Sequence, residues 1–277
     1  MERKILLTDT ADEPGLIYKI TEVCFLHGLN IIKNQEYVAT DERRFFMRTY
    51  LEGDFNDRFL PEVQRKLGKE ADVRLVNEGK KHLVVLVTKE AHCLGDLLMK
   101  HYSGTLNATI DAVIGNYDVL RDLVERFDVP FELVSHEGLS REEHCHKVLE
   151  AVQKYSPDYV VLAKYMRIIT PEFLQAFRNR VINIHHSFLP AFIGAKPYQQ
   201  AFDRGVKIIG ATAHFVTEEL DNGPIIEQDV IKVDHNFSAE MMARSGRDVE
   251  RLVLDRALTD VLEDRVFVHG NKTVVFK

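Results

Sequence analysis

Two polar side chains stand two positions apart at the end of an apolar run, in the stretch Val181-Ile182-Asn183-Ile184-His185. If this run is a strand, alternate residues point to one face, so Asn183 and His185 can converge on one small substrate group. An asparagine amide donates hydrogen bonds without titrating, which suits an oxygen that gains negative charge. A histidine can carry a proton near neutral pH. The pair suits acyl chemistry, and the alternative is a strand that simply runs into a solvated loop.

Two further groups belong to the same question. His186 points away from His185 if the strand is still regular there. Asp221 lies in the polar loop 217–222, which Gly223 and a proline follow, and Asn-Gly-Pro predicts a tight turn. His185 and Asp221 are 36 positions apart in the sequence, which shows nothing about contact. Asp221 therefore remains either a solvated turn residue or a proton acceptor.

The elements that must position these groups follow a polar break at Gly79-Lys80-Lys81. Before the break, the hydrophobic patterns predict strands at 3–9, 30–40, 43–53 and 71–78 and helices at 15–28 and 56–67. The order β-α-β-β-α-β is the ferredoxin-like plan. We therefore expect one domain at residues 1–78 and a second at residues 79–277.

After the break, short apolar runs alternate with helical segments. Strands are expected at 82–88, 109–116, 131–136, 159–165 and 181–186, and helices at 95–103, 119–127, 141–155 and 171–177. Such runs predict a Rossmann-like α/β fold with a mostly parallel sheet covered on both faces. Ligands of these sheets bind beyond the carboxyl ends of the strands, where Asn183 and His185 fall. The rest predicts strands at 206–216 and 223–233, a helix at 238–263 and a hairpin at 265–277.

Composition and charge argue against several classes of protein. The 277 residues include 43 acidic and 36 basic side chains, so no basic surplus exists for sequence-independent nucleic-acid binding. No apolar run approaches the roughly 20 residues that span a bilayer, and the first residues lack the apolar core of a secretion signal. Three scattered cysteines without a C-x-x-C spacing suit a reducing cytoplasm. We expect a cytoplasmic protein without nucleic-acid or membrane partners.

Several cofactor and metal motifs are missing from the sequence. It contains neither the G-x-G-x-x-G dinucleotide fingerprint, nor a P-loop, nor the G-x-S-x-G nucleophile turn. His144 and His146 resemble metal ligands, but in a helix positions i and i+2 diverge around the axis. No metal site is therefore expected. An α/β protein with Asn, His and Asp at strand ends and no cofactor motif favours acyl-type transfer or hydrolysis.

Three segments carry a family resemblance: LAKYMRII (162–169), NIHHSFLP (183–190) and HFVTEELDNGPII (214–226). They are similar to the folate-dependent formyltransferases, and the resemblance extends over about residues 81–233. That family carries Asn-x-His at a strand end and an aspartate on a later loop. The resemblance therefore implies that Asn183, His185 and Asp221 are the catalytic residues.

The resemblance also implies a set of substrate contacts. The family's loop whose backbone binds the pterin ring maps to Met166-Arg167-Ile168, and its arginine that holds the glutamate tail resembles Arg141. Where the formyl-transferring members usually have proline, this chain has His186. The residues expected to contact substrate are Met166, Arg167, Ile168, Arg141, His186, Glu219 and Leu220.

Three other segments point to the hydrolytic branch of the family. Residues 1–78 resemble an ACT domain, and both 190–202 and the tail 244–276 resemble those of the hydrolytic members. Water would then attack the N10-formyl carbon of 10-formyltetrahydrofolate, giving tetrahydrofolate and formate for purine synthesis. Asn183 would donate to the carbonyl oxygen, and His185 would also face that oxygen and help pass a proton to N10. Asp221 would orient His185 and accept a proton from water, directly or through a chain. No cofactor besides the folate substrate is expected.

The ACT resemblance implies regulation and assembly. A small amino-acid effector is expected near Asp12, Gly15 and Leu16, and ACT modules usually pair, so we expect a homo-oligomer, a dimer or tetramer. Three alternatives remain open. The chain could pass the formyl group to an amine, or it could bind folate and amino acids as a sensor without turnover. A dinucleotide-dependent oxidoreductase is disfavoured by the missing glycine fingerprint.

Overall fold

The computed structural model describes residues 2–191 and 197–277, which divide into two compact units. The first unit runs up to Gly79 and also contains Asp264–Phe267 and Val274–Lys277. The second unit contains Lys80–Glu263 and Val268–Thr273. The expected domain boundary, after residue 78, is one residue before the observed boundary after Gly79. The expectation that all of 79–277 forms the second domain is wrong, because parts of the last segment pack with the first unit.

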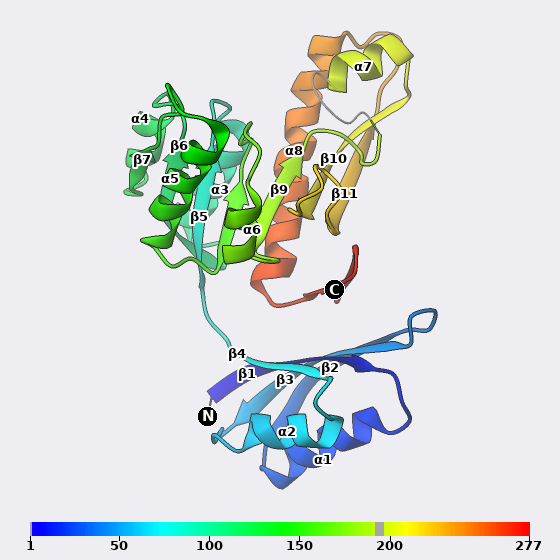
Figure 1. Ribbon diagram of the computed structural model, residues 1–277. Coiled ribbons are helices and arrows are strands. Elements are labelled where there is room, and N and C mark those ends of the chain that lie inside the picture. The colour runs from blue at the N-terminus through cyan, green and yellow to red at the C-terminus, as the bar shows by residue number, and fades with distance from the viewer. Residues whose placement is uncertain (1, 192–196) are drawn as a thin grey trace. The chain divides into compact units, whose positions relative to one another are not determined.

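The first unit has the element order predicted from the sequence. It consists of β1 (Glu2–Ala11), α1 (Leu16–Leu26), β2 (Asn30–Ala39), β3 (Arg44–Gly53), α2 (Phe59–Leu67) and β4 (Asp72–Asn77). The strands form an antiparallel sheet in the order β2-β3-β1-β4. Both helices lie on one face of this sheet (Figure 1). This is the ferredoxin-like arrangement.

Both faces of this sheet are buried. On the helix side, Leu6 and Met47 belong to a core that also contains Ile20 of α1. Neighbouring residues of the strands point to the other face, where Phe46 packs with Phe267 and Phe276 from the chain end. The predicted C-terminal hairpin is present as β12 (Val266–His269) and β13 (Lys272–Val275). The chain end therefore supplies part of the first unit's core.

The second unit follows the predicted alternation of strands and helices. Its elements are β5 (Lys81–Val87), α3 (His92–Ser103), β6 (Ala108–Gly115), α4 (Arg121–Glu125), β7 (Phe131–Leu133), α5 (Arg141–Gln153), β8 (Tyr159–Leu162), α6 (Pro171–Ala176), β9 (Val181–His185), α7 (Pro197–Arg204), β10 (Ile208–Phe215), β11 (Ile225–Lys232) and α8 (Ala239–Leu262). Three of them, α4, β7 and β8, are markedly shorter than expected. Helix α7 was not predicted, and part of the segment 190–202 lies outside the described residues.

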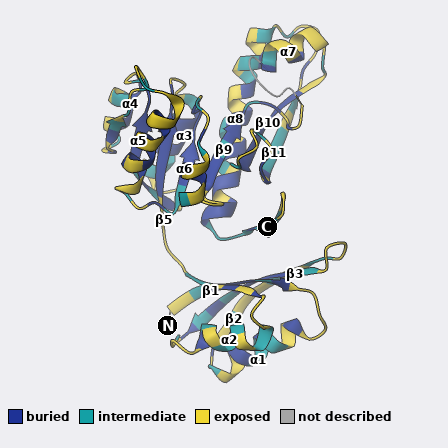
Figure 2. Cartoon of the chain, viewed as in Figure 1, coloured by how far each residue is buried: buried dark blue, intermediate teal, exposed yellow. Residues whose placement is uncertain are grey.

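The sheet of the second unit is mostly parallel, as predicted. Its order is β11-β10-β9-β8-β5-β6-β7, and only β10 and β11 run antiparallel to their neighbours. In Figure 1, α5 and α6 lie in front of this sheet and α3 and α8 behind it. Figure 2 shows the central strands buried and the outer helix faces exposed. Covering on both faces explains the near-continuous apolar sequence of these strands.

The strand order reverses between β5 and β8, because β6 and β7 extend the sheet on one side and β8 and β9 on the other. A crevice at the carboxyl ends of the strands at such a point is the usual ligand site of an open α/β sheet. The loops that follow β5 and β8 meet there: the Met166 N–H donates to Thr88 Oγ1 over 2.9 Å. Within the described residues, no helix is both long enough and apolar enough to cross a bilayer.

Candidate active site

The carboxyl end of β9 holds Asn183 and His185, and β10 lies antiparallel beside it. Thr212 stands opposite His185 and His214 stands opposite Asn183. Directly opposed residues in an antiparallel pair point to the same face of the sheet. His214 therefore joins the two residues predicted from the sequence, although the sequence reasoning did not select it.

His214 fixes the orientation of the Asn183 amide. Its Nδ1 lies 3.0 Å from the carbonyl oxygen of Phe215, which can only accept, so Nδ1 carries the proton. Burial lowers the pKa of His214, so the ring is neutral and its Nε2 accepts. Asn183 Nδ2, 3.2 Å from that Nε2, must be the donor. The second N–H of the same amide then remains available for a substrate oxygen.

His185 is joined to Asp221. Its Nδ1 lies 3.2 Å from Asp221 Oδ1, while its buried Nε2 has no hydrogen-bond partner among the described residues. Burial opposes ionisation of Asp221, but the hydrogen bond and charge of His185, together with His214, hold the pKa of this carboxyl below its usual value. The carboxylate thus orients the His185 ring and would stabilise its protonated form. A buried nitrogen without a protein partner is free to bond a water or ligand group.

The position of Asp221 follows from the turn that carries it. Asp221 adopts a left-handed conformation with φ of 53°, which aspartate tolerates better than most residues. Gly223 lies so close to the preceding strand that a Cβ there would stand 1.8 Å from the carbonyl oxygen of Phe215. The Phe215 N–H donates to Pro224 O over 2.9 Å. The Asn-Gly-Pro sequence therefore folds the loop back against β10 and brings Asp221 to His185.

Thr212 holds the segment that follows β9. Its hydroxyl donates to Ser187 O over 2.9 Å and accepts from the Leu189 N–H over 3.0 Å. Gln228 of β11 donates to the same hydroxyl over 2.9 Å. These bonds fix the backbone just beyond His185 and His186, so both imidazoles leave β9 in defined directions.

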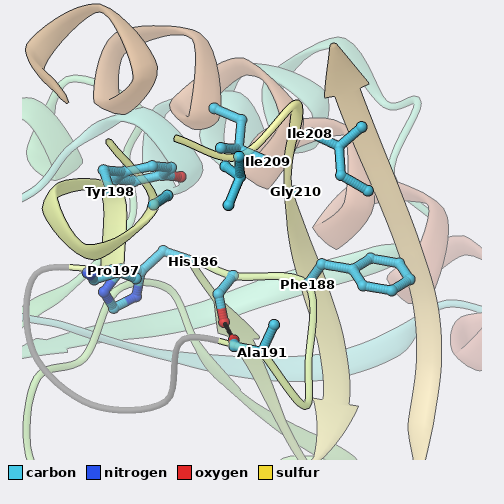
Figure 3. Close-up of a pocket in the computed structure, with 11 residues that line it drawn as sticks. His186, Phe188, Ala191, Pro197, Tyr198, Ile208, Ile209 and Gly210 are labelled. Carbon is cyan, nitrogen blue, oxygen red and sulfur yellow. Dashed lines mark hydrogen bonds between the residues drawn. The ribbon is translucent and has the colours of Figure 1, made fainter. Parts of the chain in front are cut away.

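His186 lies beside His185, with ring centroids 5.0 Å apart. Burial, the cation of Lys164 and the neighbouring His185 lower the pKa of His186 to about 4. The ring is therefore neutral at neutral pH. It borders two cavities of about 110 Å³ and 430 Å³. The smaller one is apolar, and Figure 3 shows His186 and Tyr198 toward one end of it and Phe188 toward the other.

The larger cavity extends from His186 to Met166 of the loop expected to bind the pterin. Met166, Lys164 and Tyr198 line it together with His186. Met166 and Ile168 are half exposed, as ligand-contacting side chains are before a ligand covers them. The buried Nε of Arg167 has no hydrogen-bond partner among the described residues. The structure thus brings this loop and His186 to one cavity.

Three other expected substrate contacts are exposed. Arg141 begins α5, and its guanidinium lies 2.9 Å from Glu142, which is a surface ion pair. Burial and, to a lesser degree, the charge of Arg167 lower the pKa of His144, one turn further along the same helix. The start of α5 and loop 166–168 therefore lie in one region. Glu219 and Leu220 are exposed in the loop that carries Asp221, with Glu219 O accepting from the Asn222 N–H.

The expected effector residues lie in the first unit. Gly15 precedes α1 with φ of 88°, and no side chain caps the first N–H groups of that helix. The Asp12 N–H donates to Arg43 O over 2.8 Å. Asp12 and Gly15 are exposed and Leu16 is buried. The first turn of α1 is thus open to solvent.

A second polar cluster lies beside His186, and the sequence reasoning missed it. Glu250 of α8 is fully buried, and Tyr198 donates to its Oε1 over 2.8 Å. Its Oε2 lies 3.1 Å from Lys164 Nζ and 2.8 Å from His92 Nε2. Lys164 is itself only 3% exposed. Burial opposes ionisation of Glu250, but His92, Lys164 and Tyr198 lower its pKa to about 2. The cluster is therefore a buried ion pair with additional hydrogen bonds.

Two signals in the sequence point to this cluster. Glu250 falls on the buried stripe of α8, among Val249, Val253 and Leu254, where a charged residue is rare unless it is paired. Lys164 follows the apolar strand Tyr159–Leu162, as His185 ends β9. His92, Cys93 and Glu250 also bring possible ligand atoms within 4.8 Å of one another. Because the Lys164 ammonium already occupies the carboxylate, we describe this group as an ionic cluster. The predicted location of His144 and His146 in a helix is confirmed.

The second unit matches one known class of proteins, the formyl transferases. The profile of the formyl transferase family matches residues 81–258, from β5 into α8. The chain belongs to the formyl transferase family.

Two relatives that match nearly the full length of this chain carry the same name. The formyltetrahydrofolate deformylase of Haemophilus influenzae is 61% identical over 276 residues, which cover 99% of each chain. The crystal structure of a formyltetrahydrofolate deformylase from Pseudomonas syringae pv. tomato superposes with a TM-score of 0.95 at 43% identity, covering 100% of this chain and 95% of that one.

A shorter solved structure matches only part of this chain. Glycinamide ribonucleotide transformylase 1 from Symbiobacterium toebii superposes with a TM-score of 0.70 at 29% identity. It covers 73% of this chain, whereas 97% of its own length is matched. The two deformylases thus share nearly the whole length of this chain, and the transformylase shares only about three quarters of it.

Proposed function

We propose that this chain hydrolyses 10-formyltetrahydrofolate to tetrahydrofolate and formate in the cytoplasm, supplying formate for purine synthesis and balancing the one-carbon pool. The observation that carries the proposal is the buried His185 Nε2, unpartnered among the described residues, next to a free amide N–H of Asn183 and backed by Asp221. Full-length similarity to formyltetrahydrofolate deformylases supports the substrate. Three buried, unpaired cysteines are in keeping with a reducing compartment.

The geometry assigns a role to each group in the attack of water on the formyl carbon. The free N–H of Asn183 donates to the formyl oxygen as it gains charge. His185 takes a proton from the water at Nε2, and Asp221 stabilises the imidazolium that forms. When the bond from carbon to N10 breaks, the same Nε2 returns that proton to N10. Asp221 thus acts on the water through His185, and the formic acid formed loses its remaining acidic proton to become formate.

The folate would lie across the carboxyl ends of β5, β8 and β9. Backbone groups of 166–168 would bind the pterin ring, with Glu219 and Leu220 on its other border, and Arg141 would meet the glutamate tail. Support for this placement comes from the 430 Å³ cavity that joins Met166 to His186. No group besides the folate is needed, because hydrolysis transfers no electrons.

Formate release decides between this function and its alternatives. The purified full-length protein is incubated with 10-formyltetrahydrofolate and no acceptor, and formate is followed. Release that does not depend on an acceptor is expected. Release only with an amine such as glycinamide ribonucleotide would establish formyl transfer instead. The similarity to a transformylase is the reason to test this alternative. Folate binding without turnover under either condition would establish a sensor.

We propose that the first unit is an ACT-type module that pairs with a second copy and binds a small amino acid near Asp12–Leu16. Its ferredoxin-like sheet and the uncapped first turn of α1 support this, because free N–H groups at a helix start can take a carboxylate. All twenty amino acids are titrated against formate release and thermal stability of the full chain, and sedimentation gives its assembly. A monomer that responds to no amino acid would contradict both parts.

A further inference from the structure

The hydrolysis proposed above leaves one hydrogen of the attacking water without a partner. His185 Nε2 can take only one of the two hydrogens. The neighbouring ring of His186 is 5.0 Å away between centroids and borders the cavity that also contains Met166 of the folate loop. A neutral imidazole has one nitrogen that accepts a hydrogen bond, whereas an imidazolium has none. The charge of His186 therefore decides whether it can hold the water.

The groups around His186 set that charge. His185 with Asp221 lies on one side, and Tyr198 lies on another at 6.2 Å between ring centroids. Lys164, Glu90, Glu240 and Arg247 line the same cavity as His186. The Lys164 ammonium lies 3.1 Å from Glu250 and 3.9 Å from Glu90. A fixed cation in a poorly solvated place disfavours a second positive charge nearby.

Lys164 is held in place by the buried side chains around its partner, Glu250. Glu250 of α8 receives Lys164, His92 and Tyr198, which come from three other segments: the end of β8, the start of α3, and α7. Tyr198 reaches the carboxylate because α8 has Gly246 beneath it; a Cβ there would lie 2.0 Å from the Tyr198 hydroxyl. A glycine inside a helix costs about 1 kcal/mol relative to alanine. Gly246 therefore lowers the stability of α8 but leaves the space that the Tyr198 ring occupies.

We propose that the buried pair of Lys164 and Glu250 keeps His186 uncharged, so that His186 accepts one hydrogen of the attacking water while His185 takes the other. The inference rests on the hydrolytic function proposed above. His186 is then a catalytic residue, and Lys164, Glu250, His92 and Tyr198 are positioning residues. The step remains balanced: the water oxygen bonds to the formyl carbon, one proton passes through His185 to N10, and the hydrogen held by His186 stays on the formic acid until it ionises.

The first arm of the test needs no turnover. The imidazole of His186 is titrated by NMR in the full chain, with its signals assigned by their loss in His186→Gln. Lys164→Met removes the cation and leaves Glu250 facing the ring, so the titration midpoint of His186 should rise by about one pH unit or more. Lys164→Arg, which keeps the charge, should leave the midpoint near that of the wild type. An unchanged midpoint in Lys164→Met overturns the proposal.

Two further variants distinguish loss of the Lys164 charge from a general disturbance of the fold. Lys164→Met/Glu250→Gln removes both charges and should give a midpoint between the wild type and Lys164→Met. Lys154→Met is the matched control, because Lys154 forms an exposed pair with Glu132 at 3.1 Å. It should leave the His186 titration unchanged. A shift in the control equal to that in Lys164→Met would also overturn the proposal.

The second arm measures the role of His186 in formate release. His186→Gln should lower kcat about 10- to 100-fold with KM for 10-formyltetrahydrofolate nearly unchanged, because the lost contact is with water. Lys164→Met should lose activity on the acid side at a higher pH than the wild type, and this difference should vanish in a His186→Gln background. Wild-type kcat in His186→Gln overturns the proposal. Absence of formate from the wild type would instead refute the hydrolytic function, and the NMR arm would still report on the cluster.

Discussion

Two buried polar clusters lie in the second unit, and they differ in how fully they are satisfied. In the cluster of Asn183, His185, His214 and Asp221, the His185 Nε2 has no partner among the described residues. In the cluster around Glu250, both carboxylate oxygens receive donors from three other segments. A buried polar atom without a partner costs free energy, so a folded protein keeps one where a ligand will supply the bond. The open nitrogen of the first cluster suits the substrate site proposed above, whereas the second cluster is satisfied by its own side chains.

The contrast separates effects on turnover from effects on stability. Changes in the first cluster should lower turnover and leave the free energy of unfolding nearly unchanged, since part of its bonding is reserved for substrate. Changes in the second should lower the free energy of unfolding, because they leave a buried charge unpaired.

Asp221→Asn is expected to have the largest effect. An amide in place of the carboxylate cannot stabilise the His185 imidazolium, so kcat for formate release should fall about 100- to 10,000-fold. The residual activity should also lose the pH dependence that the pair of His185 and Asp221 confers. Steady-state kinetics from pH 5 to 9 measure both. Persistent activity with an unchanged pH profile would reduce Asp221 to a turn residue.

Asn183→Ala should follow closely. It removes the donor to the developing oxyanion, and loss of one such donor typically costs about 100- to 1,000-fold in rate. Folate affinity should change little, since the bond strengthens mainly in the transition state. Single-turnover rates and fluorescence binding of a folate analogue separate the two effects. Equal losses in binding and turnover would place Asn183 in substrate binding alone.

The sequence predicted the groups that share one strand, and it failed for those that meet across strands. Asn183 and His185 lie on one face because strand side chains alternate. His214 meets Asn183 only through the antiparallel register of β9 and β10, which no local pattern specifies. Asp221 reaches His185 through the fold of its turn; the family resemblance implied this contact at 3.2 Å, but no local pattern specified it.

Element order was predictable for the same reason: apolar periodicity is local. The return of Phe267 and Phe276 to the first unit was not predictable, since apolar alternation identifies a hairpin but not the sheet it covers. Glu250 was within reach of sequence reasoning, because a charge on the buried stripe of a helix requires a partner. What the sequence could not show is that the partner is Lys164. The roles of Arg141, Glu219 and Leu220 in binding folate stay predictions.

Glu250→Gln tests the second cluster directly. It leaves Lys164 buried with a neutral partner, and breaking a buried pair costs about 3–5 kcal/mol. The lowered pKa of Glu250, about 2 in the fold against an ordinary 4.5, adds a pH signature. Stability from this carboxylate is present above its unfolded pKa and is lost as pH falls from about 4.5 toward 2. Denaturation at several pH values should show this acid loss in the wild type and not in Glu250→Gln. An equal acid slope in both would contradict the pairing.

Gly246→Ala should have the smallest effect, and its sign depends on Tyr198. In the wild-type background the new Cβ would meet the Tyr198 phenol, at 2.0 Å from its oxygen, so the ring must move and its bond to Glu250 is weakened. A hydrogen bond to a charged group contributes about 1.5–3 kcal/mol, and alanine returns about 1 kcal/mol of helix propensity. The net change should be a destabilisation of about 1 kcal/mol.

With Tyr198→Leu as background, neither the phenol nor its hydrogen bond remains to be lost. The same Gly246→Ala change should then stabilise the protein by up to about 1 kcal/mol, through helix propensity alone. Chemical denaturation of the four proteins gives this double-mutant cycle, and a coupling of about 2 kcal/mol is expected. If Gly246→Ala has the same sign in both backgrounds, the glycine does not serve the passage of Tyr198, and Glu250 is held by Lys164 and His92 alone.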